Sequence, residues 1–173
     1  MKRESGFTLI ELLVVVAIIG ILAAMAVAGL LRARMSANES SAIGSVRTIA
    51  NGQMVYSSSC AHGYFATDLT TLGVPPPSST DPFISPDLTS GPTVYKSGYR
   101  LELAAASGST AGTTDCNGTS TVTSFYLKAE PISFGGSGNR SFATTSVVNN
   151  TIWVSQAALA PAEPFSAPSA PLQ

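Results

Sequence analysis

Hydrophobic residues are most concentrated near the start of the chain. From Phe7 to Leu31 every residue is apolar or small except Thr8 and Glu11. A helix rises about 1.5 Å per residue, so this stretch is long enough to cross a hydrocarbon core of about 30 Å. The pattern therefore predicts a membrane-spanning helix over residues 7–31.

Beyond Leu31 the pattern becomes amphipathic. Apolar residues recur at the three- and four-residue spacing of one helix face, at Ala42, Ile43, Val46, Ile49, Ala50 and Met54. We expect residues 32–56 to continue the first helix, giving one element from about Phe7 to about Tyr56 that is roughly 75 Å long. Its second half should pack on a globular head.

Residues 57–156 are expected to form that head. Prolines in 57–95 disfavour helices and central strands, so we expect a surface connection there, with one helical turn near Asp68–Leu72. Strand-like runs follow at 99–103, 125–130, 141–145 continuing through 147–148, and 151–154. They predict a small antiparallel sheet folded against the amphipathic half of the helix, which is an α+β fold.

The end of the chain, residues 157–173, is rich in alanine and proline and nearly uncharged. Such a segment has no period that would bury a core, so we expect an extended, mobile tail with some polyproline character. The sequence leaves open whether the tail lies along the head or touches a neighbouring subunit.

The size and charge of the chain limit its function. It has 173 residues and a formal net charge of -1, so the part after the first helix suffices for one small domain but not for two. Without a basic patch, nucleic acid is not an expected partner. Arg32 and Arg34 directly follow the apolar run, which is typical of anchors at a membrane interface.

Two cysteines, Cys60 and Cys116, both follow the apolar stretch. Their wide separation excludes the closely spaced CxxC pattern of zinc and redox sites. Two cysteines in an exported domain can close one bridge, so we expect a Cys60–Cys116 disulfide. The alternative is a pair of buried thiols.

Residue types that carry catalysis are sparse. His62 is the only histidine, which removes histidine clusters for metal and leaves no convincing nucleophilic triad. The carboxylates are scattered, without the spacing of a calcium loop. We therefore expect no enzyme, no cofactor and no metal.

Glu11 is the residue that most needs an explanation, because a carboxylate inside an apolar span costs roughly 2.5–3.5 kcal/mol on insertion scales. A secretory signal has its cleavage site after its apolar core, whereas in this chain the only well-formed cleavage site precedes the apolar run. A cut between Gly6 and Phe7 would remove residues 1–6 as a leader and place the new amino group one helical turn from Glu11. An ammonium there and the Glu11 carboxylate would lie on the same face of the helix. The alternative is a protonated Glu11 near lipid headgroups.

These residues carry a family resemblance. The run from Gly6 through Glu11 to Leu22, GFTLIELLVVVAIIGIL, resembles the class III prepilin signal of type IV pilins and of the pseudopilins of type II secretion. The resemblance implies cleavage after Gly6 and N-methylation of Phe7 by a prepilin peptidase. It also implies that Glu11 pairs with the Phe7 amino group of a neighbouring subunit and sets the register of assembly. Some pseudopilins bind calcium, which leaves Asp81, Asp87 or Asp115 as an alternative metal site.

The stem carries small residues, among them Gly20 and Gly29, that allow close helix packing. Many family members have a proline near Ala28, where the stem melts in the filament, and this chain lacks it. Gly20 and Gly29 can still loosen the helix, because glycine disfavours helix by up to about 1 kcal/mol relative to alanine. Whether the stem melts stays open.

The leading functional hypothesis is a structural pilin that polymerises into a helical, extracellular type IV pilus, with adhesion or motility as further roles. The resemblance implies an inner-membrane precursor and an inner-membrane assembly platform. One alternative is a type II secretion pseudopilin in a periplasmic pseudopilus. Another is a monomeric, membrane-anchored binding domain, which predicts no cut after Gly6.

Overall fold

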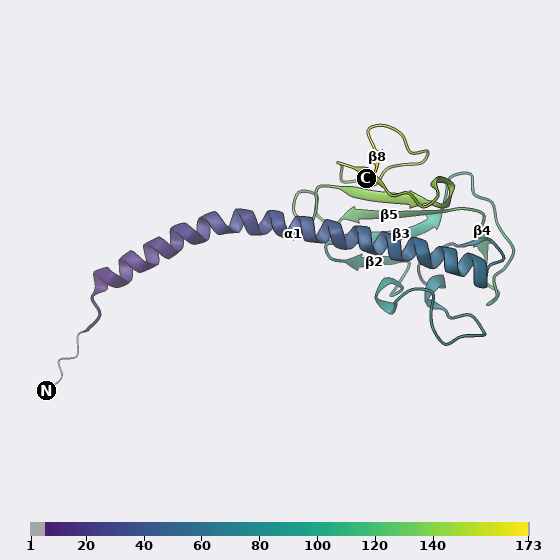
Figure 1. Cartoon of the computed structure of the whole chain (residues 1–173), viewed down its shortest axis with the longest axis horizontal. Helices are drawn as coiled ribbons and strands as arrows, with labels where there is room; N and C mark the ends of the chain where they lie inside the picture. The colour runs from purple at the N-terminus through teal and green to yellow at the C-terminus, as the bar shows by residue number, and fades with distance from the viewer. Residues whose placement is uncertain (1–5, 173) are drawn as a thin grey trace. The chain divides into compact units, whose positions relative to one another are not determined.

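The computed structural model describes residues 6–172 and divides the chain into two compact units. We call Met1–Arg34 the stem and Met35–Gln173 the head. One helix, α1 (Leu9–Ser59), runs through the stem and continues into the head (Figure 1). The predicted long helix is confirmed, although it begins two residues later and ends three residues later than the sequence indicated.

The head half of α1 buries one face. The buried apolar residues of that face are Ala42, Val46, Ile49, Ala50 and Tyr56, in agreement with the helical spacing of the sequence. Met54 was predicted on the same face but is 49% exposed, because it follows the completely buried Gln53 and points outward. At Gly52 an added Cβ would lie 2.2 Å from Ile84 Cγ2, so a glycine is required where the 57–95 segment crosses the helix.

The sheets are antiparallel, as predicted. The larger sheet has the order β2-β3-β5-β6-β7-β8, and a small second sheet pairs β1 with β4 (Figure 1). The strands are β1 (Phe65–Ala66), β2 (Thr93–Lys96), β3 (Tyr99–Ala105), β4 (Thr121–Val122), β5 (Phe125–Pro131), β6 (Ser141–Thr145), β7 (Trp153–Ser155) and β8 (Ala170–Pro171). Short 3-10 helices occupy Thr71–Gly73, Pro86–Leu88 and Ser146–Val148.

Two predicted boundaries were wrong. Residues 147–148 lie in a 3-10 helix rather than a strand, and the following strand begins at Trp153 rather than Thr151. The Thr145 hydroxyl accepts the Val147 N–H at 3.1 Å and caps that turn, which competes with continued strand pairing.

The 57–95 segment was expected on the surface, and this was wrong. Leu69, Leu72 and Leu88 are almost completely buried, and Ile84 is 5% exposed. Prolines prevent regular backbone pairing but do not prevent neighbouring apolar side chains from reaching the core. Each such burial contributes roughly 1.5–3 kcal/mol, so the segment closes the core formed by α1 and the sheet.

The tail lies along the head, one of the two placements that the sequence left open. β8 pairs with β7, and the Tyr126 hydroxyl donates to the Pro161 carbonyl at 2.7 Å. The Ala160 N–H donates to Glu130 Oε1 at 3.1 Å. Phe165 stacks on Trp153 with ring centroids 5.4 Å apart. Several separate contacts therefore hold this segment against the strands.

Glu130 makes tail attachment dependent on pH. Burial acts to raise the pKa of Glu130, but the Ala160 N–H and Arg100 hydrogen bonds and nearby cations outweigh it, so the pKa lies below its ordinary 4.5. The charged form therefore stabilises the folded state above about pH 4.5, and this contribution is lost as the pH falls through the lowered pKa. We predict that the protection of the Ala160 amide against exchange, relative to an unstructured peptide at the same pH, falls in that range.

Glu130→Gln should lower the protection of the Ala160 amide already at neutral pH and remove most of the acid dependence of that protection, as hydrogen-exchange NMR would measure. Glu102→Gln is the matched control, because Glu102 pairs with Lys128 on the same sheet at 3.1 Å. Equal exchange profiles in wild type and Glu130→Gln would contradict the assignment.

Candidate assembly site in the stem

The first turn of α1 is closed by its own side chains. Thr8 precedes the helix, and its N–H and hydroxyl both donate to Glu11 Oε2, at 2.9 and 2.6 Å. The Glu11 N–H donates back to Thr8 Oγ1 at 3.3 Å. This reciprocal arrangement is a capping box, which satisfies two backbone N–H groups that a helix start leaves unpaired. The carboxylate therefore has a local structural role.

The capping box uses only one carboxylate oxygen. Both Thr8 donors go to Oε2, and within the described residues Oε1 of Glu11 has no hydrogen-bond partner. Phe7, Ile10, Val14 and Val15 surround Glu11 at an open hollow of about 400 Å³. A charged oxygen therefore faces outward from an apolar helix face.

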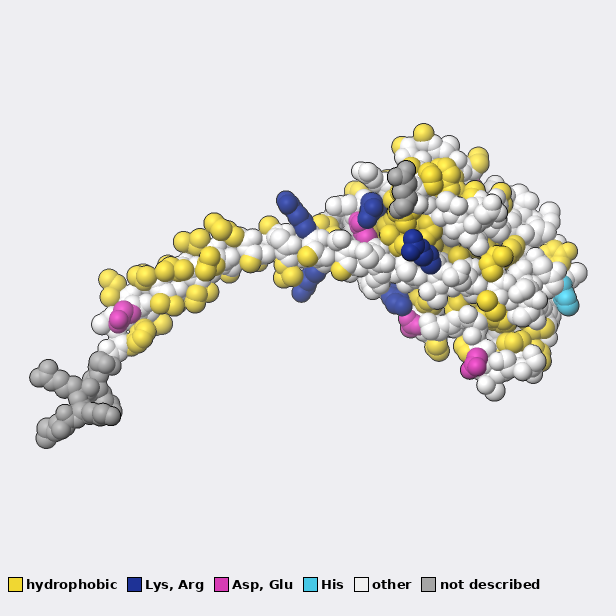
Figure 2. Space-filling model, viewed as in Figure 1, with side chains coloured by type: hydrophobic (Ala, Val, Ile, Leu, Met, Phe, Trp, Pro, Cys, Tyr) yellow, Lys and Arg dark blue, Asp and Glu magenta, His cyan; other side chains and the backbone are white. Residues whose placement is uncertain are grey.

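The described part of the stem up to Leu31 offers no compensating charge near Glu11. From Gly6 to Leu31 Glu11 is the only charged residue, and Arg32 is about 30 Å away along the helix. The helix is long and apolar enough to cross a membrane, by length and composition, and Figure 2 shows apolar side chains along the visible face of the stem. A cationic partner for Glu11 must come from outside this helix.

The predicted cleavage position lies at the edge of the described chain. Gly6 and Phe7 are both exposed, Phe7 at 78%, whereas leader residues 1–5 lie outside the described residues. Gly20 and Gly29 lie within the continuous helix, and no atom lies within 4 Å of a Cβ built at either one. Their backbone is therefore open to close approach by another helix.

The other candidate residues lie in the head. Cys60 and Cys116 form a disulfide with a Cα–Cα distance of 4.9 Å, which ties the 106–124 loop to the end of α1. Closing a loop of this length stabilises the fold by up to about 4 kcal/mol.

The alternative calcium carboxylates do not meet. Asp87 pairs with Lys96 at 2.6 Å, and Asp115 accepts the Tyr56 hydroxyl at 2.8 Å. No group of three or more His, Cys, Asp or Glu suited to a metal occurs in residues 6–172.

Thr8 is the residue that the sequence interpretation missed. It was noted only as an exception in the apolar run, although the T-x-x-E spacing of Thr8 and Glu11 is the signature of a capping box. The T-x-x-E spacing is therefore a sequence signal for this cap.

A long N-terminal helix, apolar in its first half, that continues into a small α+β head is a pilin-like fold. The family described as "Prokaryotic N-terminal methylation motif" matches residues 1–27. The type IV wide pilus major component PilA4 of Thermus thermophilus is 59% identical over 39 residues, which cover 22% of this chain and 30% of PilA4. No solved structure matches the chain.

Together the motif, the relative and the fold support the type IV pilin family for this chain. The similarity to PilA4 is confined to 39 residues and spans less than a third of PilA4. The head is described by its own structure alone.

The capping box predicts a specific effect of Thr8. Thr8→Ala should destabilise the first turn of α1 by about 1 kcal/mol, because the N-cap hydroxyl is lost. Amide exchange at Glu11, measured by NMR on the full chain in micelles, should accelerate by about fivefold, while Thr8→Ser should preserve wild-type exchange. Unchanged exchange in Thr8→Ala would show that the cap contributes nothing.

Proposed function

We propose that this chain is a prepilin that is cut after Gly6, methylated at Phe7 and polymerised through its stem into an extracellular type IV pilus. The observation that carries the proposal is the free Oε1 of the exposed Glu11, which lies in an apolar stretch, residues 6–31, that contains no Lys or Arg. The match of residues 1–27 to the N-terminal methylation motif supports it.

Cleavage creates the missing cation. The new amino group of Phe7 is one helical turn from Glu11 in its own chain, where Phe7 is exposed. In a bundle of staggered stems, the Phe7 ammonium of one copy reaches Glu11 of the next. At an effective dielectric of about 20, two charges 4 Å apart interact by about 4 kcal/mol, which is an upper bound because desolvation opposes it.

The capping box and the intermolecular pair are compatible. Thr8 holds Oε2, so the χ angles of Glu11 are already fixed while Oε1 stays free for the neighbour. Ordering the carboxylate before assembly lowers the entropy lost when the pair forms. Only one axial stagger brings Oε1 to a neighbouring Phe7, so the pair also sets the register.

The rest of the chain supports the same role. Gly20 and Gly29 leave the stem surface open to close helix packing, and the Cys60–Cys116 disulfide suits a head exposed to an oxidising exterior. The peptidase, the inner-membrane assembly platform and the passage from inner membrane to pilus follow from the same proposal. Adhesion and motility would be properties of the finished filament.

We predict that Glu11→Gln leaves membrane insertion unchanged but lowers the yield of sheared filaments by about tenfold or more, which corresponds to a lost interaction of at least about 1.4 kcal/mol. Glutamine preserves the capping-box acceptor and the shape of the side chain, so the difference reports the charge. Membrane fractionation and electron microscopy of the sheared fraction provide the two measurements.

Intact mass is the companion measurement. The mature chain should lack residues 1–6 and carry one added methyl group. Retention of the leader would contradict the proposal and favour a monomeric anchored domain. Normal filament yield from Glu11→Gln would contradict the role of the charge, and cut wild-type chains without long filaments would favour a short secretion pseudopilus.

A further inference from the structure

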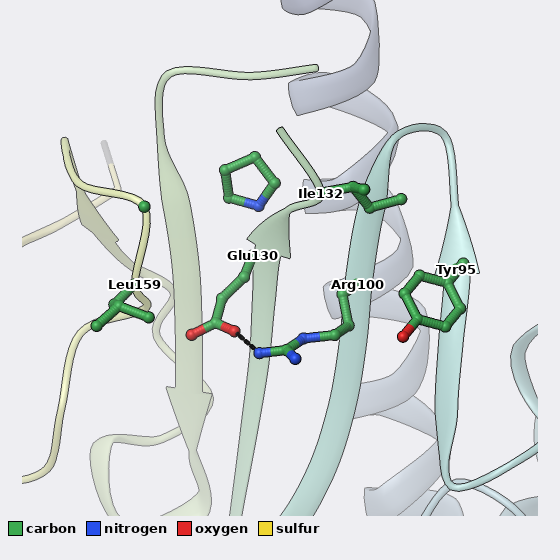
Figure 3. A pocket seen from close by; sticks show the side chains of 7 residues that line it. Tyr95, Arg100, Glu130, Ile132 and Leu159 are labelled. Atoms are coloured by element: carbon green, nitrogen blue, oxygen red, sulfur yellow. Dashed lines mark hydrogen bonds and ion pairs between the residues drawn. The ribbon is translucent and has the colours of Figure 1, made fainter. Parts of the chain in front are cut away.

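A pocket of about 340 Å³ opens on the sheet face that turns away from α1 (Figure 3). Its floor is the Arg100–Glu130 ion pair between β3 and β5. Its rim is formed by Tyr95, Ile132 and Leu159, which are 66%, 58% and 71% exposed. Three large apolar side chains thus surround a polar floor, and we call this site the outer pocket.

The free hydrogen-bonding capacity of the outer pocket consists of donors. Glu130 Oε1 accepts the Ala160 N–H and Oε2 accepts from Arg100, so both acceptor oxygens are engaged. Among the described residues, the other N–H groups of Arg100 and the Tyr95 hydroxyl have no partner. The Arg100 side chain is 41% exposed and that of Glu130 only 9%, so the cation is the more exposed partner of this ion pair.

A matching ligand is apolar, offers hydrogen-bond acceptors and brings a carboxylate to the exposed Arg100 guanidinium. Proline has these hydrogen-bonding properties, because it has a carbonyl but no N–H, and apolar pockets with an aromatic rim are the usual sites for proline-rich segments. The chain itself carries such a segment in residues 74–82, which we call the proline loop.

The proline loop presents these groups to solvent. It contains Pro75-Pro76-Pro77 and Asp81 and no Lys or Arg. Val74 is 48% exposed, and Pro77 is exposed at a turn closed by the Ser79 N–H and the Pro76 carbonyl at 2.9 Å. Within the described residues Asp81 forms no ion pair. The loop is thus apolar and acidic, and the outer pocket is apolar and exposes the cationic partner of its ion pair.

The two surfaces lie at opposite ends of the head. Ile132, on the rim of the outer pocket, donates its N–H to the Gly98 carbonyl. The Ser97 hydroxyl of the same turn accepts from the Ser41 hydroxyl of α1. The outer pocket therefore lies near Ser41. The proline loop lies beyond the end of α1, where Asn117 donates to the Pro75 carbonyl at 3.3 Å. Ser41 and Ser59 are about 27 Å apart along the helix.

The loop is also tethered, because the Phe83 N–H donates to the Leu72 carbonyl at 3.0 Å. The proline loop therefore cannot fill the pocket of its own head. Two complementary surfaces at opposite ends of one chain make a head-to-tail contact, which continues from copy to copy and forms open filaments.

We propose that the outer pocket binds the proline loop of a second copy of this chain and joins heads along the filament. This inference rests on the proposed assembly into a filament and adds a contact between heads to the contact between stems. In it, Pro77 packs between Tyr95 and Leu159, and Asp81 approaches the Arg100 guanidinium.

Cysteine crosslinking within filaments tests the contact. In Pro77→Cys/Tyr95→Cys filaments, oxidation should produce a ladder of covalent multimers on non-reducing gels. The matched control is Pro77→Cys/Val147→Cys, because Val147 is 70% exposed and follows the end of β6 that is remote from the outer pocket. The control should stay monomeric. Filaments that form normally but yield no ladder with Tyr95→Cys would overturn the head contact and leave the proposed function intact.

A second measurement does not depend on filament formation. A fluorescent peptide of residues 73–82 should bind the full chain in micelles saturably, and a peptide with Pro75, Pro76 and Pro77 replaced by alanine should bind about tenfold more weakly. Tyr95→Ala should weaken binding of the native-sequence peptide to the same degree. Equal binding of the two peptides would overturn the inference even if no filaments form.

Discussion

A carboxylate on an apolar helix needs a partner, and the stem is organised around that need. Glu11 costs roughly 2.5–3.5 kcal/mol in a membrane span. Thr8 satisfies Oε2 through a capping box but brings no charge. One oxygen of the carboxylate therefore helps to start the helix, and in the proposed assembly the other receives a cation. Every feature of the proposed assembly, from cleavage to register, follows from supplying that cation.

The head uses buried carboxylates differently, to join segments far apart in the sequence. Glu39 on α1 accepts the Asn139 N–H and the Arg140 Nε, both at 2.8 Å. Asp115 accepts the Tyr56 hydroxyl and two backbone N–H groups of its own turn, and Glu130 joins β3 to the tail. Each is paired or fully hydrogen-bonded, which is the condition for burying such a group. The outer pocket results from one of these joints.

The sequence predicted the features that depend on periodicity and composition. The spacing of apolar residues predicted the long helix and the main strands, and the interruption of the apolar run by a carboxylate singled out Glu11. The sequence did not predict β2, which lies at the end of a proline-rich segment. It also did not predict the burial of Leu69 and Leu88, because only three-dimensional contacts show which loop residues reach the core. The outer pocket was equally hidden, since Tyr95, Arg100 and Leu159 meet through strand pairing and tail docking. The Thr8–Glu11 cap was visible as a motif but was not considered.

The central claim is that Glu11 of one copy contacts the Phe7 amino group of another. Solid-state NMR on filaments assembled from a mixture of two pools tests it directly, with Phe labelled with ¹⁵N in one pool and Glu labelled with ¹³C in the other. Only contacts between copies can then give a signal. We predict a cross-peak between the Phe7 amine and the Glu11 carboxyl carbon at an ion-pair separation of about 4 Å. Well-ordered mixed filaments without that cross-peak would contradict the account.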